Sequence, residues 1–243
     1  VLRLEPLKKK WQDFGFYVRE VDGNNMQELL DALECNFEGK EDIQALLQGA
    51  PSFGNGDLEV DTLGRMLEKS ALDFTARYAG KNGVQPLEIR TTSVTANVPH
   101  GKFVGATPNG RKAWMPLSDG SSPSHGSDRN GPTAVLLSQY QSTNWNAANR
   151  ACRLLNMKMA PKTVEGEEGT KKLVDLIRAF INLRVWHLQM NIINRETLVA
   201  AQKDPQKYKN LVVRIAGYSA YFVDLSPDLQ NDLIDRTEQE NCD

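Results

Sequence analysis

The second half of the chain alternates short apolar runs with amphipathic segments of helical period, and this alternation constrains the fold most. Strands are predicted at 184–194 and 210–216, and helices at 165–183, 195–208 and 226–237. Pro205 breaks the middle helix, while Ser226 and Pro227 are a typical N-cap and first helical residue. Strand–helix–strand units of this kind predict an α/β fold.

The first half is mainly helical. Residues 24–37, 40–48 and 58 to about 78 carry apolar side chains at helical spacing, and a glycine-rich stop follows at 79–83. The β-branched stretch 86–98 then predicts a strand. We therefore predict a helical segment, 1–84, followed by an α/β segment, 85–243.

A long segment between the two halves is a loop by composition. Residues 99–133 contain six glycines and five prolines, together with large apolar residues such as Phe103 and Trp114. Loops of this length in compact chains are usually functional or disordered, and the apolar side chains favour an ordered, functional loop.

Charge and cysteine usage exclude several classes of function. The formal net charge is −2, which does not favour nucleic-acid binding, and no apolar run is long enough to span a membrane. Three scattered cysteines, Cys35, Cys152 and Cys242, have no histidine at metal spacing, which indicates a reducing cytoplasm and no metal site. Because residue 1 is Val, we expect the chain to be one piece of a longer or split protein.

Gly217 has unusual neighbours for a glycine that ends a strand. It lies in RIAGYSAYF, residues 214–222, between Ala216 and Tyr218 and without the Asn, Asp, Pro or Ser that typically accompany a turn. The residues alone leave two interpretations open, a structural turn or a site of chemistry.

Four stretches together resemble one known family. RIAGYSAYF resembles the glycyl radical motif, GATPNGRKAW and DGSSPSHGSDRNGPTAV resemble the loop upstream of it, and WHLQMNIIN resembles the penultimate strand. On this basis the chain is identified as the C-terminal portion of a glycyl radical enzyme of the pyruvate formate-lyase and glycerol dehydratase-like branch. The resemblance implies the C-terminal part of a ten-stranded α/β barrel with surrounding helices.

The resemblance assigns the radical to Gly217. A Cα radical is delocalised over the flanking amide groups and needs a flat Cα, which glycine allows. We expect Gly217 to be buried among aromatic residues, between a preceding strand and a following helix. The resemblance implies no bound cofactor, because a separate activating enzyme that uses S-adenosylmethionine installs the radical. The residues expected to support the radical loop are Arg214, Ala216, Tyr218, Ser219 and Tyr221.

The same resemblance implies an essential group that these residues do not supply. Family members carry a catalytic cysteine in a Gly-Cys-x-Glu loop, whereas Cys35 and Cys152 lie on predicted helices and Cys242 near the last residue. An N-terminal segment or subunit must therefore provide the cysteine. The expected assembly is a dimer in the anaerobic cytoplasm or a bacterial microcompartment, with a small-molecule substrate.

Arg90 and Val94 are the predicted substrate-binding residues. Both were placed on one face of the strand in 86–98, since side chains alternate along a strand. Arg90 either binds an anionic substrate or pairs with a carboxylate such as Glu88, and Val94 lines the pocket or belongs to the core. His125 is interpreted as a hydrogen-bond donor that fixes its loop.

The predicted function is elimination. The resemblance favours a C–X lyase or dehydratase acting on a small hydroxylated substrate of the isethionate, choline or diol type. One alternative is C–C chemistry, as in an arylacetate decarboxylase, a succinate-adding synthase or a formate acetyltransferase. Another is a stand-alone glycyl radical repair subunit.

Overall fold

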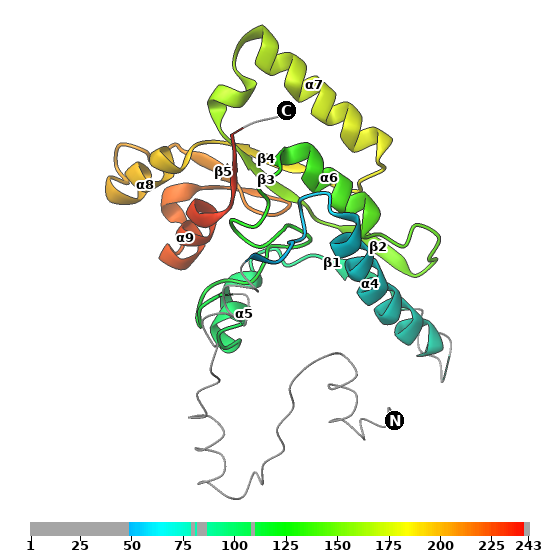
Figure 1. The fold of residues 1–243 in the computed structure, drawn as a ribbon. Helices are drawn as coiled ribbons and strands as arrows, with labels where there is room; N and C mark the ends of the chain where they lie inside the picture. The colour runs from blue at the N-terminus through cyan, green and yellow to red at the C-terminus, as the bar shows by residue number, and fades with distance from the viewer. Residues whose placement is uncertain (1–48, 79–80, 82–86, 108–109, 241–243) are drawn as a thin grey trace, which may run out of the picture. The chain divides into compact units, whose positions relative to one another are not determined.

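The computed structural model describes residues 49–78, 81, 87–107 and 110–240 (Figure 1). They belong to one compact unit, Gly49–Asp243. The helices predicted at 24–37 and 40–48 lie outside the described residues, and the proposed boundary at residue 84 stays a prediction. The described α-helices are α4 (Leu58–Tyr78), α5 (Asn97–Phe103), α6 (Gly131–Gln141), α7 (Gly166–Asn182), α8 (Arg195–Lys203) and α9 (Pro227–Asp235).

The described strands form three small sheets. The strands are β1 (Ile89–Thr91), β2 (Arg150–Arg153), β3 (Asn156–Met159), β4 (Gln189–Ile192), β5 (Val212–Arg214), β6 (Ser219–Tyr221) and β7 (Glu238–Gln239). One parallel sheet has the order β4-β3-β7, a second pairs β1 with β2 in parallel, and β5 and β6 form an antiparallel hairpin. Short 3-10 helices lie at Pro161–Val164 and Phe222–Asp224.

Strand β3 is buried on both faces. Met157 and Met159 pack with α6 and α7 in a core cluster that includes Leu136 and Leu176. The alternate residues, Asn156 and Lys158, face the opposite side and are also buried, because successive side chains point to opposite faces of a strand. The sheet β4-β3-β7 therefore presents an apolar face to α6 and α7 and a polar face to the C-terminal elements.

A second core joins α8 and α9 to the β5–β6 hairpin. It contains buried residues such as Leu198, Ile215, Phe222 and Leu233. The predicted N-cap of α9 is confirmed, since the Ser226 side chain accepts a hydrogen bond from Leu229 N with Pro227 at the first helical position. This core fixes the base of the hairpin that carries Gly217, and Figure 1 shows α8 and α9 on the side of the strands away from α7.

Several predictions of local structure are wrong. The strand predicted over 86–98 is only Ile89–Thr91, and α5 begins inside the predicted range. Cys152 lies on β2 rather than on a helix, because β2 pairs with the distant β1 and this long-range pairing overrides local helical spacing. The element after Gly217 is β6 and not a helix. Within the described residues, no helix is long and apolar enough to span a membrane.

Candidate active site

Gly217 lies in the tight turn that connects β5 to β6. Ile215 N donates to Tyr218 O at 2.9 Å, which closes a hairpin whose two central residues are Ala216 and Gly217. Gly217 has φ +86°, a left-handed conformation that favours glycine. Apart from its two chain neighbours, none of the described residues lies within 4 Å of a Cβ added at this position. Within the described residues, the backbone conformation favours glycine at position 217, and the available space does not require it.

The tip of the turn is exposed and its base is buried. Tyr218 is 42% and Tyr221 48% exposed, whereas Ile215 and Phe222 are both 0% exposed. The prediction that Tyr218 and Tyr221 bury the glycine does not hold within the described residues. Tyr221 shares the exposed face of β6 with Ser219, opposite Ala220, because side chains alternate along a strand, and Tyr218 precedes β6.

Side chains from neighbouring elements hold the backbone of this turn. Asn191 bonds both backbone groups of Arg214, accepting from its N at 2.7 Å and donating to its O at 2.6 Å. Arg236 Nη1 donates to Ile215 O at 3.2 Å. Gly217 N donates to Gln189 Oε1 at 2.7 Å. The turn is thus positioned by β4 and by the end of α9, which are far apart in sequence.

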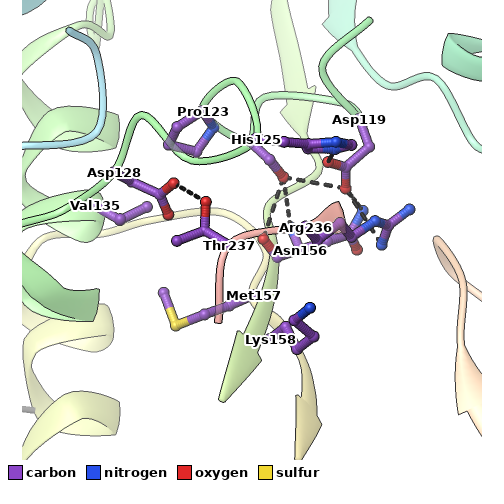
Figure 2. A pocket seen from close by; sticks show the side chains of 11 residues that line it. Asp119, Pro123, His125, Asp128, Val135, Asn156, Met157, Lys158, Arg236 and Thr237 are labelled. Carbon is purple, nitrogen blue, oxygen red and sulfur yellow. Dashed lines mark hydrogen bonds and ion pairs between the residues drawn. The ribbon is translucent and has the colours of Figure 1, made fainter. Parts of the chain in front are cut away.

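A buried chain of hydrogen bonds continues from Gln189 across the sheet. Gln189 Nε2 donates to Asn156 Oδ1 at 2.7 Å, across the register pair of β4 and β3. Asn156 Nδ2 donates to Asp119 Oδ2 at 2.6 Å. Arg236 then pairs with Asp119 at 3.4 Å and with Asp232 at 2.9 Å. Figure 2 shows Asp119, His125, Asn156 and Arg236 grouped on one side of β3.

The two buried carboxylates of this cluster differ in their acidity. Burial alone would raise the pKa of Asp119, but the charge of Arg236 and the interactions with His125 and Asn156 outweigh it, so the pKa is lowered. Burial raises the pKa of Asp232 despite the Arg236 charge, and nearby Asp119 adds to the rise. Asp119 is therefore the carboxylate that stays ionised most firmly, and it orients the Asn156 amide.

His125 lies between the same carboxylates. Its Nε2 is 3.7 Å from both Asp119 Oδ1 and Asp232 Oδ1, beyond hydrogen-bonding distance. At these distances Nε2 makes no hydrogen bond within the described residues, and the predicted role of His125 as a donor that fixes its loop stays a prediction. A cavity of about 20 Å³ adjoins it, with Lys158 and Arg236 in its lining, which is room for about one water molecule.

The predicted radical-loop residues fall into two groups. Arg214 contacts the turn network directly, since its Nε donates to Gln189 Oε1 at 3.1 Å and its Nη1 to Ser219 Oγ at 3.2 Å. Ala216 is buried, at 4% exposure. Tyr218 and Tyr221 are exposed.

The predicted substrate residues lie elsewhere. Arg90 is exposed on β1 and pairs with Glu88 at 2.9 Å, which is the alternative that the sequence left open. The prediction that Val94 shares a strand face with Arg90 is wrong, because Val94 lies beyond β1 with φ 53° and is 45% exposed. The strand ends at Thr91, so the alternation of strand side chains does not reach Val94. Their contact with substrate stays a prediction.

Cys152 is a partly buried free thiol on β2. Cys35 and Cys242 lie outside the described residues. Among the residues that the structure describes, no group of three or more His, Cys, Asp or Glu side chains is arranged to hold a metal ion.

Sequence reasoning missed the residues that position the turn: Asp119, Asn156, Gln189, Asp232 and Arg236. A signal was present at Gln189 and Asn191, two amides in the otherwise apolar stretch 188–193. A polar side chain that alternates with apolar ones on a buried strand needs a hydrogen-bonding partner. The partner's identity depends on strand register, which the sequence does not state.

Two protein families match this chain. The family described as "Glycine radical" matches residues 117–223, which include Gly217 together with Gln189, Asn156 and Asp119 of the hydrogen-bonded chain behind it. The family described as "Pyruvate formate lyase-like" matches residues 19–101. The chain belongs to the glycyl radical enzyme family. The predicted membership is confirmed.

Curated relatives agree with the family assignment. The chain is 58% identical over 215 residues to isethionate sulfite-lyase of Oleidesulfovibrio alaskensis, covering 88% of this chain and 26% of that protein. It is 39% identical to trans-4-hydroxy-L-proline dehydratase of Clostridioides difficile, covering 88% of this chain and 27% of the relative. The chain thus spans about a quarter of the length of these curated glycyl radical enzyme relatives.

A solved structure of the family confirms the fold. The glycerol-bound form of the B12-independent glycerol dehydratase from Clostridium butyricum aligns with a TM-score of 0.76 at 41% identity, covering 88% of this chain and 27% of that one. The predicted fold class, the C-terminal part of a glycyl radical enzyme α/β barrel, is confirmed.

Proposed function

We propose that this chain is the glycine-radical-bearing C-terminal part of a glycyl radical lyase that eliminates sulfite from isethionate. The observation that carries the proposal is the 58% identity to isethionate sulfite-lyase. Identity to the 4-hydroxyphenylacetate decarboxylase glycyl radical subunit of Clostridioides difficile is 36%. The activity belongs to the whole enzyme, of which these residues supply the radical turn and its support.

In the proposed mechanism Gly217 stores a radical. An activating enzyme that uses S-adenosylmethionine removes one hydrogen atom from the Gly217 Cα. The glycyl radical regains a hydrogen atom from a cysteine thiol outside the described residues, which becomes a thiyl radical. The thiyl takes a hydrogen atom from the hydroxyl-bearing carbon of the substrate, and the hydroxyl proton and the neighbouring sulfonate then leave, the sulfonate as sulfite. The remaining radical regains a hydrogen atom from the cysteine thiol, which gives acetaldehyde and restores the thiyl. The protein's share is to orient these groups and to exclude competing reactions.

The exposed turn is consistent with a site that other residues complete. Gly217, Tyr218 and Tyr221 protrude from the described part of the chain, so a further segment or subunit is proposed to cover them and to bring the cysteine. Arg90 is proposed to contact the anionic sulfonate and Val94 the substrate's carbon chain. We further propose a dimeric enzyme that works in an oxygen-free cytoplasm.

A second candidate is a dehydratase that acts on a diol or a related alcohol. It is favoured by the fold match to the glycerol dehydratase and by the 39% identity to the hydroxyproline dehydratase. A stand-alone repair subunit is less favoured, because the pyruvate formate lyase-like match at residues 19–101 extends well beyond the radical motif.

The experiment is a substrate panel with the activated, assembled enzyme. Isethionate, choline, propane-1,2-diol, glycerol and 4-hydroxyphenylacetate are each supplied without oxygen, and sulfite, trimethylamine, aldehydes and p-cresol are measured. The proposal predicts sulfite from isethionate at a rate far above every other product. Faster turnover of a diol would transfer the assignment to a dehydratase, and p-cresol would favour the decarboxylase alternative.

A further inference from the structure

Gln189 has a position that the proposed mechanism does not use. It is 6% exposed on β4, and its Oε1 accepts two hydrogen bonds, from Gly217 N at 2.7 Å and from Arg214 Nε at 3.1 Å. Among the hydrogen bonds of the described residues, the first is the one that reaches the Gly217 peptide itself. Gln189 therefore contacts the residue proposed to carry the radical.

Asn156 and Asp119 fix the orientation of the Gln189 amide. Ionised Asp119 can only accept, so Asn156 must present its NH₂ group to Asp119, at 2.6 Å. The Asn156 carbonyl then faces Gln189 and accepts from Nε2 at 2.7 Å. This leaves Gln189 Oε1 as the group directed at Gly217. The charge pair of Arg236 and Asp119 is thereby coupled to the polarity of the bond at the glycine.

A hydrogen bond at this peptide acts on the radical's electronic structure. Spin on the Cα is shared with the adjacent amide nitrogen and carbonyl. An acceptor on the N–H polarises that bond and increases electron donation from nitrogen, and hydrogen bonds in a buried chain strengthen one another. The same bond also holds the peptide between residues 216 and 217 in one plane relative to β4.

We propose that Gln189 is a positioning residue that sets the spin distribution of the Gly217 radical through its bond to the Gly217 N–H. The proposal rests on the proposed function, since it requires a radical at this glycine. Gln189 exchanges no atom with substrate or cysteine. Its effect is on how strongly the radical is delocalised onto nitrogen.

The test is electron paramagnetic resonance of the activated, assembled enzyme that contains ¹⁵N-labelled glycine. Gln189→Met removes the acceptor. Gln189→Glu keeps an oxygen acceptor but replaces the amide donor, so that Arg214 favours an anionic carboxylate and the Asn156 carbonyl opposes it. The matched control is Gln202→Met, because Gln202 donates an amide hydrogen bond to Asn231 at 2.9 Å, away from the turn. The measured quantities are the ¹⁵N hyperfine coupling, the g values and the number of spins.

The ¹⁵N coupling is expected to be lower than native in Gln189→Met, different from native in Gln189→Glu, and equal to native in Gln202→Met. A merely structural role would lower the number of spins without moving the coupling or the g values. If Gln189→Met forms no radical, the comparison of Gln with Glu decides. An unchanged coupling in the variants, or no radical in both while Gln202→Met activates normally, overturns the proposal. Absence of any doublet in native enzyme would instead overturn the proposed function.

Discussion

The turn at Gly217 and the segment around Arg90 are both predicted to be functional, but they differ in how many contacts with distant residues hold them. The turn has its backbone bonded by side chains of β4 and by Arg236. Arg90 instead makes an exposed ion pair with a residue two positions away. The turn needs a fixed backbone, and long-range contacts provide it. The Arg90 segment is proposed to be completed by other residues, so it needs only an accessible side chain. The predictions below test this difference.

Removing the charge of Arg236 should have the largest effect on stability. Arg236→Met leaves Asp119 and Asp232 buried without their shared cation and removes the bond to Ile215 O. Loss of one partner of a buried ion pair costs about 3–5 kcal/mol. Urea unfolding should show this loss, with Arg178→Met, from an exposed pair on α7, as the control at about 0–1 kcal/mol. Equal losses in the two variants would contradict the account of a buried network.

Lys158 should make stability depend on pH in a defined window. Its Nζ donates to Ile234 O at 2.8 Å, and burial lowers its pKa to about 8, with Glu238 and Asp235 opposing and Arg195 and Arg236 adding to the effect. Since the folded pKa lies below the unfolded value of 10.5, the protonated group destabilises the fold. This cost is complete below pH 8 and disappears as pH rises toward 10.5.

The measurement is the difference in unfolding free energy between native protein and Lys158→Met. Relative to this variant, native protein should gain about 1–3 kcal/mol between pH 8 and pH 10.5. Lys162→Met, at an exposed ion pair, is the control and should show almost no change over that range. A flat difference for Lys158→Met would show that the buried amine does not titrate in this window.

Arg90→Ala should have the smallest effect on stability, about 0–1 kcal/mol, because an exposed ion pair contributes little. If Arg90 binds the sulfonate, KM for isethionate in the assembled enzyme should rise while the thermal midpoint stays the same. Glu88→Gln is the matched control, since it breaks the same pair without removing the guanidinium. An unchanged KM in Arg90→Ala would contradict the proposed contact with the sulfonate and would support only the ion pair with Glu88.

The sequence predicted the α/β class, the family and the helices α4, α7, α8 and α9. These follow from local information: apolar spacing, the Ser226 cap and the radical motif. It did not predict β2, the exposure of Tyr218 and Tyr221, or the chain from Gln189 to Asp232. Those depend on which strands are neighbours, as in the register of Asn156 with Gln189, and register comes from contacts between distant residues.

The central claim is that the radical is stored at Gly217, and isotope labelling tests it most directly. The activated enzyme should give a doublet near the free-electron g value, split by the one hydrogen left on the Gly217 Cα. Growth with Cα-deuterated glycine should collapse this doublet toward a single line, and Gly217→Ala should abolish it. The control is Gly166→Ala, which has a similar left-handed φ of +72° and equally open surroundings, so strain of about 1 kcal/mol is matched. A doublet that survives deuteration or the Gly217→Ala change would contradict the claim.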